Sequence, residues 1–366
     1  MRAPPVRPIV IAAGGTGGHF FPAEAFGAEL VTRGHRIALM TDARSAARKS
    51  EVFAERERYV LRGAGIAGRD MLRAAQAATE LAAGVVQARK ILASINAAAV
   101  VGFGGYPSVA PALGARLLRE GPTVILHEQN AVLGRANRFL AGRVAALALS
   151  FETTERIPET AQTVLTGNPV RPAVAHRPYE PGAARLLVLG GSLGAHVFSA
   201  VLPAAVRELP PALRARLEIA QQCRPEDIEA VRAAYETVGV DAELATFFPD
   251  IAERLARASL VIARAGASTV AELTVAGRPA ILVPLPGAID DHQRANAHAL
   301  ATAGAAWVIE QSALEARALA TEIATLLEGP DALARAAEAA RGMARPEAAT
   351  RLAELVEALM RQETRA

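Results

Sequence analysis

The chain has 366 residues, which is more than one hydrophobic core ordinarily holds, so two domains are expected. Hydrophobic residues make up 51% of the chain and charged residues 21%, a balance that excludes an intrinsically disordered protein. A net charge of +3 is too small to indicate nucleic-acid binding. The single cysteine, Cys223, excludes an internal disulfide and a cysteine zinc site and favours a reducing compartment.

The first residues superficially imitate a signal peptide. Their apolar run, residues 9–13, is too short for one and breaks at Gly14 and Gly15. Two longer uncharged stretches, residues 97–115 and 186–206, contain several glycines and prolines, which is typical of strand, loop and helix rather than of a membrane span. The sequence therefore predicts a cytosolic protein, or one that sits on a membrane from the cytosolic side.

Short apolar runs alternate with helical patterns along the chain, which is typical of a parallel α/β sheet. In the first half, strands are expected at residues 9–13, 36–41, 98–102, 123–127 and 144–149. A first helix is expected at residues 22–33, ending at Gly34. The proline-rich residues 167–184 predict a linker between domains. In the second half, strands are expected at residues 185–189, 217–221, 243–246, 260–263 and 280–283, and a helical region from residue 312 onward.

Each half begins with a strand that runs into a glycine-rich loop: Gly-Gly-Thr-Gly-Gly-His at residues 14–19 and Gly-Gly-Ser-Leu-Gly-Ala at residues 190–195. Such glycines bring backbone N–H groups close to an anion at the start of the next helix. Phe20 stands where a dinucleotide fingerprint has its third glycine, and Asp42 is a weak candidate for its ribose carboxylate. A tight turn explains either loop alone, but one loop in each half favours two ligand sites.

Residues 264–272, Arg-Ala-Gly-Ala-Ser-Thr-Val-Ala-Glu, follow a predicted strand in the second half. Thr269 and Glu272 have the spacing of a capping box, which would explain both without a ligand. Alternatively, the small residues admit a diphosphate and the Glu272 carboxylate accepts hydrogen bonds from a ribose diol. Asp290, Asp291 and His292 are adjacent and do not converge easily on one metal ion, so the acids of a helix N-terminus are the better interpretation.

Four consecutive polar residues, His-Glu-Gln-Asn at 127–130, end a predicted strand of the first half, where α/β sheets bind ligands. Together with the loops above they complete an ordered set of motifs that resembles the MurG family of transferases, which add N-acetylglucosamine to undecaprenyl-pyrophosphoryl-N-acetylmuramoyl-pentapeptide. The resemblance runs from about residue 9 to residue 311. It rests on residues 14–19, 102–106, 127–131, 167–171, 190–192, 264–267 with Glu272, and 291–293 with Asn296.

The resemblance implies a GT-B fold, an α/β architecture of two Rossmann-like domains whose parallel sheets face each other across a cleft. It implies an acceptor domain at residues 1–166, a UDP-sugar domain at 167–345, and a last helix, 346–366, that packs back on the first domain. The implied activity is that of an inverting hexosyltransferase of cell-wall biogenesis, and so of cell shape and division. It would transfer N-acetylglucosamine from UDP-N-acetylglucosamine to the C4 hydroxyl of the lipid-linked muramoyl-pentapeptide, forming the β1,4-linked disaccharide precursor of peptidoglycan.

The resemblance also implies which residues bind substrate, and it implies no cofactor and no metal ion. The residues of the first domain would lie near the transferred sugar and diphosphate, and those of the second would hold uracil, ribose, phosphate and sugar hydroxyls. The implied set is Thr16, Gly17, Gly18, Asn130, Arg171, Ser192, Phe248, Arg264, Ala267, Ser268, Thr269, Glu272, Gln293 and Asn296. The chain departs from the family pattern at Leu193, where a glutamine is usual, and at residues 221–224, where many relatives carry His-Gln-(Ser/Thr)-Gly.

An inverting displacement needs a general base for the acceptor hydroxyl. His19 is the natural base by position and residue type, and Glu128 is its rival; the sequence leaves the choice open. The charge of the leaving UDP would be met by helix N-termini, backbone N–H groups and Arg171.

A lipid acceptor implies a peripheral enzyme on the cytoplasmic face of the bacterial inner membrane. Residues 69–95 form a long helical pattern that mixes apolar side chains with basic ones, which suits an anionic membrane surface, although an ordinary buried helix face explains any one residue as well. The apolar residues are Met71, Leu72, Leu81, Val85 and Val86; the basic ones are Arg69, Arg73, Arg89 and Lys90, with Arg135, Arg138 and Arg143 nearby. Two alternatives are a UDP-N-acetylglucosamine 2-epimerase and a non-catalytic UDP-sugar-binding module.

Overall fold

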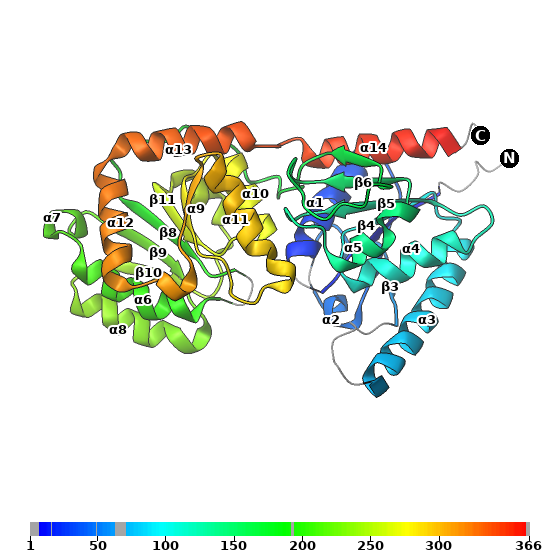
Figure 1. The fold of residues 1–366 in the computed structure, drawn as a ribbon, viewed down its shortest axis with the longest axis horizontal. Helices are drawn as coiled ribbons and strands as arrows, with labels where there is room; N and C mark the ends of the chain where they lie inside the picture. The colour runs from blue at the N-terminus through cyan, green and yellow to red at the C-terminus, as the bar shows by residue number, and fades with distance from the viewer. Residues whose placement is uncertain (1–6, 16, 49, 63–70, 192–193, 364–366) are drawn as a thin grey trace. The chain divides into compact units, whose positions relative to one another are not determined.

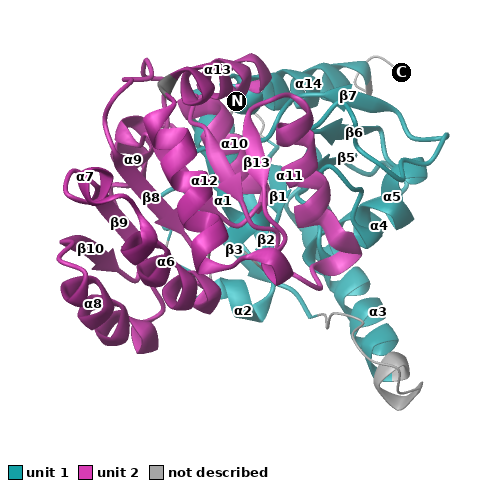
Figure 2. Cartoon of the chain, turned by 60° about the vertical axis from the view of Figure 1, so that its left-hand side comes forward, with its two compact units in different colours: residues 1–171, 346–366 teal, residues 172–345 magenta. Residues whose placement is uncertain are grey.

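The computed structural model describes residues 7–15, 17–48, 50–62, 71–191 and 194–363. The chain divides into two compact units: unit 1 comprises residues 1–171 and 346–366, and unit 2 comprises residues 172–345 (Figure 2). The boundary was expected after residue 166, and the division falls after Arg171.

Within the described residues of unit 1, seven parallel strands form one sheet in the order β3-β2-β1-β4-β5-β6-β7. Figure 1 labels β3, β4, β5 and β6 of this sheet. Their bounds are β1 Ile9–Ala12, β2 Ile37–Thr41, β3 Glu57–Val60, β4 Ala99–Gly102, β5 Thr123–Glu128, β6 Ala146–Leu149 and β7 Thr163–Leu165. The helices are α1 Gly17–Thr32, α2 Ala43–Ala46, α3 Met71–Ser94, α4 Val109–Arg116, α5 Arg135–Leu140 and α14 Ala348–Glu363, with 3-10 turns η1 Tyr106–Ser108 and η2 Ala141–Arg143.

The central strand β1 is buried on both faces, which is why its sequence is a continuous apolar run. Ile9 and Ile11 belong to the same hydrophobic cluster as α1 and α14. Val10 and Ala12 belong to the cluster that contains α3, α4 and α5. The carboxyl-terminal helix α14 therefore supplies part of the core of unit 1, although it follows unit 2 in the sequence.

Within the described residues of unit 2, six parallel strands form a sheet in the order β10-β9-β8-β11-β12-β13. Their bounds are β8 Arg185–Leu189, β9 Glu218–Gln222, β10 Ala242–Ala245, β11 Leu260–Ala263, β12 Ala280–Leu282 and β13 Ala306–Val308. The helices are α6 His196–Glu208, α7 Pro211–Arg214, α8 Ile228–Thr237, α9 Ile251–Arg257, α10 Ala267–Ala276, α11 His292–Thr302, α12 Ala316–Glu328 and α13 Pro330–Met343, with 3-10 turns η3 Pro225–Asp227, η4 Ile289–Asp291 and η5 Gln311–Ala313.

Both sheets reverse their strand order beside the first strand of the unit. In unit 1 the chain leaves β1 for β2 and β3 and returns to β4 on the other side of β1. In unit 2 the chain leaves β8 for β9 and β10 and then returns to β11, which pairs with β8 on its other side. Ligands of doubly wound sheets bind at the carboxyl ends of the strands at such a switch point. The glycine loops after β1 and β8 lie at these two points.

Two expectations about elements need correction. The first helix begins at Gly17 rather than at residue 22, so Pro22 lies inside it; its end near Gly34 is as predicted, since Gly34 has φ +81° and its N–H bonds the Val31 carbonyl. The strands β3, β7 and β13 were not predicted. Among the described residues, no helix is both long enough and apolar enough to span a lipid bilayer.

Candidate active site

His19 lies in the first turn of α1, at the switch point of unit 1. Its ring lies beside Gly104 and Gly105, which follow β4 and have φ of +79° and +67°. A Cβ atom on Gly104 would stand 3.4 Å from His19 Cε1, and one on Gly105 would stand 3.5 Å from His19 Nε2. Any longer side chain at these positions would lie over the imidazole. The two glycines therefore keep the ring of His19 accessible.

Glu128, the last residue of β5, is buried, and its carboxylate accepts four hydrogen bonds. Oε1 accepts from the Asn130 backbone N–H at 3.1 Å and from Asn130 Nδ2 at 3.0 Å. Oε2 accepts from the Gly134 N–H and from Asn137 Nδ2, both at 2.9 Å. Such charge-assisted bonds are the stronger kind, so Glu128 anchors the loop that runs from β5 to α5.

Gln129 lies between two histidines. Its Oε1 atom is 3.0 Å from His19 Nδ1, and its Nε2 atom is 2.9 Å from His127 Nδ1. His127 is completely buried, packs on the ring of Phe103, and has Nε2 2.9 Å from the Gly167 carbonyl oxygen. Burial lowers the pKa of His127 to about 4, so this imidazole is neutral at physiological pH.

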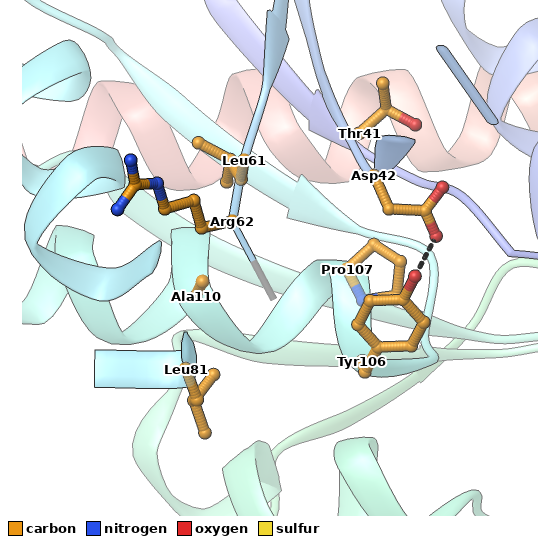
Figure 3. Close-up of a pocket in the computed structure, with 8 residues that line it drawn as sticks. All are labelled: Thr41, Asp42, Leu61, Arg62, Leu81, Tyr106, Pro107 and Ala110. Carbon is orange, nitrogen blue, oxygen red and sulfur yellow. Dashed lines mark hydrogen bonds between the residues drawn. The ribbon is translucent and has the colours of Figure 1, made fainter. Parts of the chain in front are cut away.

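A small pocket lies at the carboxyl end of β2, lined by Thr41, Asp42, Leu61, Arg62, Leu81, Tyr106, Pro107 and Ala110 (Figure 3). The Tyr106 hydroxyl donates to the Asp42 carboxylate, which also accepts from the Ser45 N–H at 2.7 Å and caps α2. Burial and the hydrogen bond to Asp42 together raise the pKa of Tyr106 to about 12. Asp42 is committed to these contacts, which disfavours a ribose-binding role.

The other residues expected to bind substrate in unit 1 surround the start of α1. Gly17 is buried, and a Cβ atom there would stand 2.9 Å from the ring of Phe21. Gly18 follows it in the first turn of α1. The Arg171 guanidinium lies 5.5 Å from the centroid of the same Phe21 ring. Thr16 lies outside the described residues.

The loop after β11 starts α10 in unit 2, and the capping box expected at Thr269 and Glu272 is not formed. The N-cap of α10 is Gly266, so Ala267, Ser268 and Thr269 form its first turn and Glu272 lies in the second. Gly266 has no side chain to cap the first N–H groups, which is typical of anion-binding helix N-termini. Glu272 is buried, and among the described residues the buried Ser268 hydroxyl has no hydrogen-bond partner.

Two implied binding residues of unit 2 hold backbone segments in place. Arg264 donates to the carbonyls of Val283 and Pro284 at 3.1 and 3.2 Å, and to Gln311 Oε1 at 2.6 Å. Its burial lowers the pKa of its guanidinium from the ordinary value. Asn296 is fully buried, and its Nδ2 donates to the Ala265 carbonyl at 3.0 Å. Arg264 therefore holds the segment after β12 and Gln311, and Asn296 holds the segment after β11.

Two further implied residues of unit 2, Gln293 and Phe248, lie after β12 and after β10. Gln293, in the first turn of α11, accepts a hydrogen bond from the Leu285 N–H at 3.0 Å. Phe248 follows β10; its ring is buried and lies 4.2 Å from the Arg254 guanidinium. Ser192 and Leu193 lie outside the described residues.

The structure also shows contacts that the sequence did not predict. At the departure from the family pattern, Arg224 donates to Asp227, whose other contact is His196 Nδ1 at 3.0 Å, next to the glycine loop of unit 2. Asn137 in unit 1 was also missed, because its link to Glu128 joins separate segments. Within the described part of the chain, no group of three or more His, Cys, Asp or Glu side chains is placed to hold a metal ion.

Two doubly wound parallel sheets, each with a glycine loop at its switch point, correspond to the GT-B fold. Residues 9–149 match the glycosyltransferase family 28 N-terminal domain, and residues 185–352 match the glycosyltransferase family 28 C-terminal domain. The chain belongs to glycosyltransferase family 28 and, within it, to the MurG family.

The similarity to relatives of known name extends over nearly the whole chain. It is 58% identical to the UDP-N-acetylglucosamine--N-acetylmuramyl-(pentapeptide) pyrophosphoryl-undecaprenol N-acetylglucosamine transferase of Granulibacter bethesdensis, over 90% of this chain and 87% of that protein. It is 54% identical to the transferase of the same name from Acidiphilium cryptum, over 91% and 92%. The crystal structure of MurG from Acinetobacter baumannii has a TM-score of 0.79 and 32% identity, over 96% of this chain and 99% of that one.

Proposed function

We propose that the chain transfers N-acetylglucosamine from UDP-N-acetylglucosamine to the C4 hydroxyl of undecaprenyl-pyrophosphoryl-N-acetylmuramoyl-pentapeptide. The observation that carries this proposal is the 58% identity, over 90% of the chain, to a transferase named for these substrates. The product is the β1,4-linked lipid disaccharide from which peptidoglycan is made, so the enzyme serves cell-wall biogenesis.

UDP-N-acetylglucosamine binds to unit 2 at the carboxyl ends of β8, β11 and β12. The first turn of α10, Ala267 to Thr269, supports binding of the diphosphate, because it carries the positive end of the helix dipole and the N-cap residue Gly266 has no side chain that would block an anion. Glu272 accepts hydrogen bonds from the ribose hydroxyls. Arg264 and Asn296 act as positioning residues, since both hydrogen-bond to backbone carbonyls.

The remaining donor contacts come from loops of unit 2 and from Arg171. The backbone at Phe248 meets uracil, and Gln293 bonds the hydroxyls of the sugar. Ser192 and Arg171 bind the donor phosphates, Arg171 through its positive charge.

His19 is the general base for the acceptor. The C4 hydroxyl gives its proton to the imidazole as its oxygen bonds to C1 of the donor sugar. The bond from C1 to the UDP oxygen breaks, and UDP leaves with the electron pair, so the configuration at C1 inverts. Thr16, Gly17 and Gly18 contact the transferred sugar and diphosphate. Glu128 is a positioning residue that holds Asn130, because its carboxylate accepts hydrogen bonds from Asn130 and Gly134 of the loop and from Asn137 of α5.

A surface of unit 1 formed by Val86, Leu117 and Phe139 holds the enzyme at the cytoplasmic face of the inner membrane. These three apolar side chains are 50%, 58% and 52% exposed. Basic residues join them: Arg89 donates to the Leu117 carbonyl at 3.2 Å, and Arg143 donates to the Phe139 carbonyl at 2.6 Å and lies over its ring. Exposed apolar area beside basic charge suits an anionic lipid surface.

Not every helix residue expected at the membrane is available to it. Val85 belongs to the core of unit 1, and Leu81 is half-buried against the same core. Arg69 lies outside the described residues. The proposed membrane-binding surface, with its exposed apolar residues and the basic residues beside them, therefore includes the carboxyl-terminal half of α3 and the ends of α4 and α5.

The test supplies UDP-N-acetylglucosamine with and without the lipid-linked muramoyl-pentapeptide and analyses the products. Transfer predicts UDP release only with the acceptor, together with a disaccharide-lipid. Release of N-acetylmannosamine would instead indicate a 2-epimerase, and absence of turnover would indicate a UDP-sugar-binding module. His19→Ala should lower kcat by about 10²–10⁴-fold, the usual contribution of a general base. The matched variant His298→Ala, at an exposed histidine of α11, should keep the wild-type rate.

A further inference from the structure

Gln129 is a buried amide with no charge of its own, yet it bridges His19 and His127. An amide oxygen and an amide nitrogen have the same shape and opposite hydrogen-bonding roles, so their placement is decided by their partners. The partners of Gln129 include a group with only one possible role.

That group is the backbone carbonyl of His127, which can only accept. Gln129 Nε2 lies 3.2 Å from this carbonyl oxygen and 2.9 Å from His127 Nδ1. Turning the amide over would set its oxygen against the carbonyl oxygen. The end of Gln129 that faces His127 is therefore the NH2 group, and the end that faces His19 is the oxygen.

A second backbone carbonyl, that of Gly167, independently determines which nitrogen of His127 carries the proton. His127 Nε2 lies 2.9 Å from the Gly167 carbonyl oxygen, so Nε2 carries the proton. The neutral ring then has its lone pair on Nδ1, where it accepts from Gln129 Nε2. Both backbone carbonyls thus require the same orientation of Gln129.

We propose that Gln129 is a positioning residue of the transfer reaction: its Oε1 accepts a hydrogen bond from His19 Nδ1–H and thereby holds the His19 tautomer whose Nε2 lone pair receives the acceptor proton. The proposal rests on the proposed function, in which His19 is the base. Nε2 is the nitrogen next to Gly105, where the chain carries no side chain. After His19 takes the proton, Nδ1–H still donates to Gln129, so the same contact serves both charge states.

The charged and titratable groups around His19 do not contact its Nδ1 atom in the way that Gln129 does. His127 lies behind Gln129 and is neutral, and the carboxylate of Glu128 is held by its four N–H donors. Arg48 and Arg171 both lie over the ring of Phe21, two residues after His19. Gln129 is the group whose oxygen contacts Nδ1, so replacing it tests this contact directly.

The direct test measures the tautomer of His19 by long-range ¹H–¹⁵N NMR of the full chain labelled with ¹⁵N-histidine, near pH 8. The His19 signals are assigned by their loss in His19→Ala. The wild-type protein should show the Nδ1–H form for His19 and the Nε2–H form for His127. An Nε2–H form of His19 in the wild-type protein would overturn the proposal without any variant at Gln129.

Two variants then separate the roles. Gln129→Leu removes the acceptor, so the His19 signals should move toward the Nε2–H form and kcat should fall by about 10²-fold or more, with the donor KM nearly unchanged. Gln129→Glu keeps an acceptor at Nδ1, so the Nδ1–H form should persist. The acidic limb of the pH–rate profile should move to higher pH, because a carboxylate favours the imidazolium. Unchanged His19 signals in Gln129→Leu would overturn the proposal.

Gln221→Leu is the matched control. Gln221 is a fully buried glutamine of unit 2, and its Oε1 accepts from the Tyr235 hydroxyl at 2.7 Å. The same substitution there should cost stability but leave the His19 tautomer and the acidic limb unchanged. A third outcome is possible: Gln129→Leu changes the tautomer of His19, while kcat and the acidic limb of the pH–rate profile stay as in the wild type. The hydrogen bond between Gln129 and His19 would then be correct, but His19 would not be the general base, and that part of the proposed function would be wrong.

Discussion

Replacing Glu128 with glutamine distinguishes between two roles of this residue, holding the loop after β5 and acting as the general base. The amide has the size of the carboxylate, but one of the two oxygens becomes an NH2 group. Each carboxylate oxygen accepts from two N–H donors, so either orientation of the amide removes two hydrogen bonds and brings donors face to face. Hydrogen bonds to a charged group contribute roughly 1.5–3 kcal/mol each. The unfolding free energy of unit 1 should therefore fall by about 3–6 kcal/mol, which lowers Tm by about 6–24 °C at roughly 2–4 °C per kcal/mol.

Circular dichroism follows both units, whereas fluorescence of Trp307, the single tryptophan, follows unit 2, since Trp307 lies in β13. Glu128→Gln should lower the transition seen by circular dichroism without an equal shift in the fluorescence transition. Glu120→Gln, at an exposed carboxylate of unit 1, is the control and should change neither. The residual activity should keep its acidic limb. If Glu128→Gln keeps the wild-type Tm while the limb disappears, Glu128 is the base and the anchoring role is wrong.

Three further predictions concern the donor, the membrane and pH. Glu272→Gln should raise the KM for the UDP-sugar by about 10-fold, from the loss of a charge-assisted bond to the ribose, with little change in Tm. Replacing Arg89 and Arg143 with glutamine should weaken retention on vesicles that contain anionic lipid at low salt, by about 1 kcal/mol per charge. The hydrogen bond from Arg224 lowers the pKa of Asp227 to about 2, and the contact with His196 lowers it as well, although burial opposes both effects. The stability from Asp227 is present above its ordinary pKa near 4 and should be lost as pH falls toward 2, so Asp227→Asn and wild-type unfolding curves should converge there.

Each of these predictions has a contrary result. Lost stability with unchanged donor affinity would make Glu272 a structural residue of α10. Arg232→Gln with Arg335→Gln removes two charges from exposed positions of unit 2, and equal weakening of vesicle retention by this pair would refute the surface on unit 1. Unfolding curves of Asp227→Asn and the wild type that stay parallel between pH 4 and pH 2 would refute the ion pair.

Local chemistry was enough to predict the repeated strand, glycine loop and helix of each unit. A strand such as β8 is buried on both faces, so its apolar run is visible without knowledge of its neighbours. The strand β3 differs, because Glu57, Arg58 and Tyr59 are half-exposed and carry no continuous apolar run. Pairing with β2 makes it a strand, and that pairing is a tertiary contact.

The roles of neighbouring polar residues at the end of β5 could not be separated from the sequence. The sequence offered His19 and Glu128 as rival bases and Asn130 as a substrate-binding residue, and it gave no role to His127 or Gln129. Their partners are distant along the chain: His19 is 110 residues from Gln129, and Gly167 is 40 residues from His127. A hydrogen bond assigns donor and acceptor only between atoms that meet. Only the folded chain, which brings α1, β5 and the segment after β7 together at the carboxyl ends of the strands, shows that the Glu128 carboxylate holds a loop and that Gln129 contacts both His19 and His127.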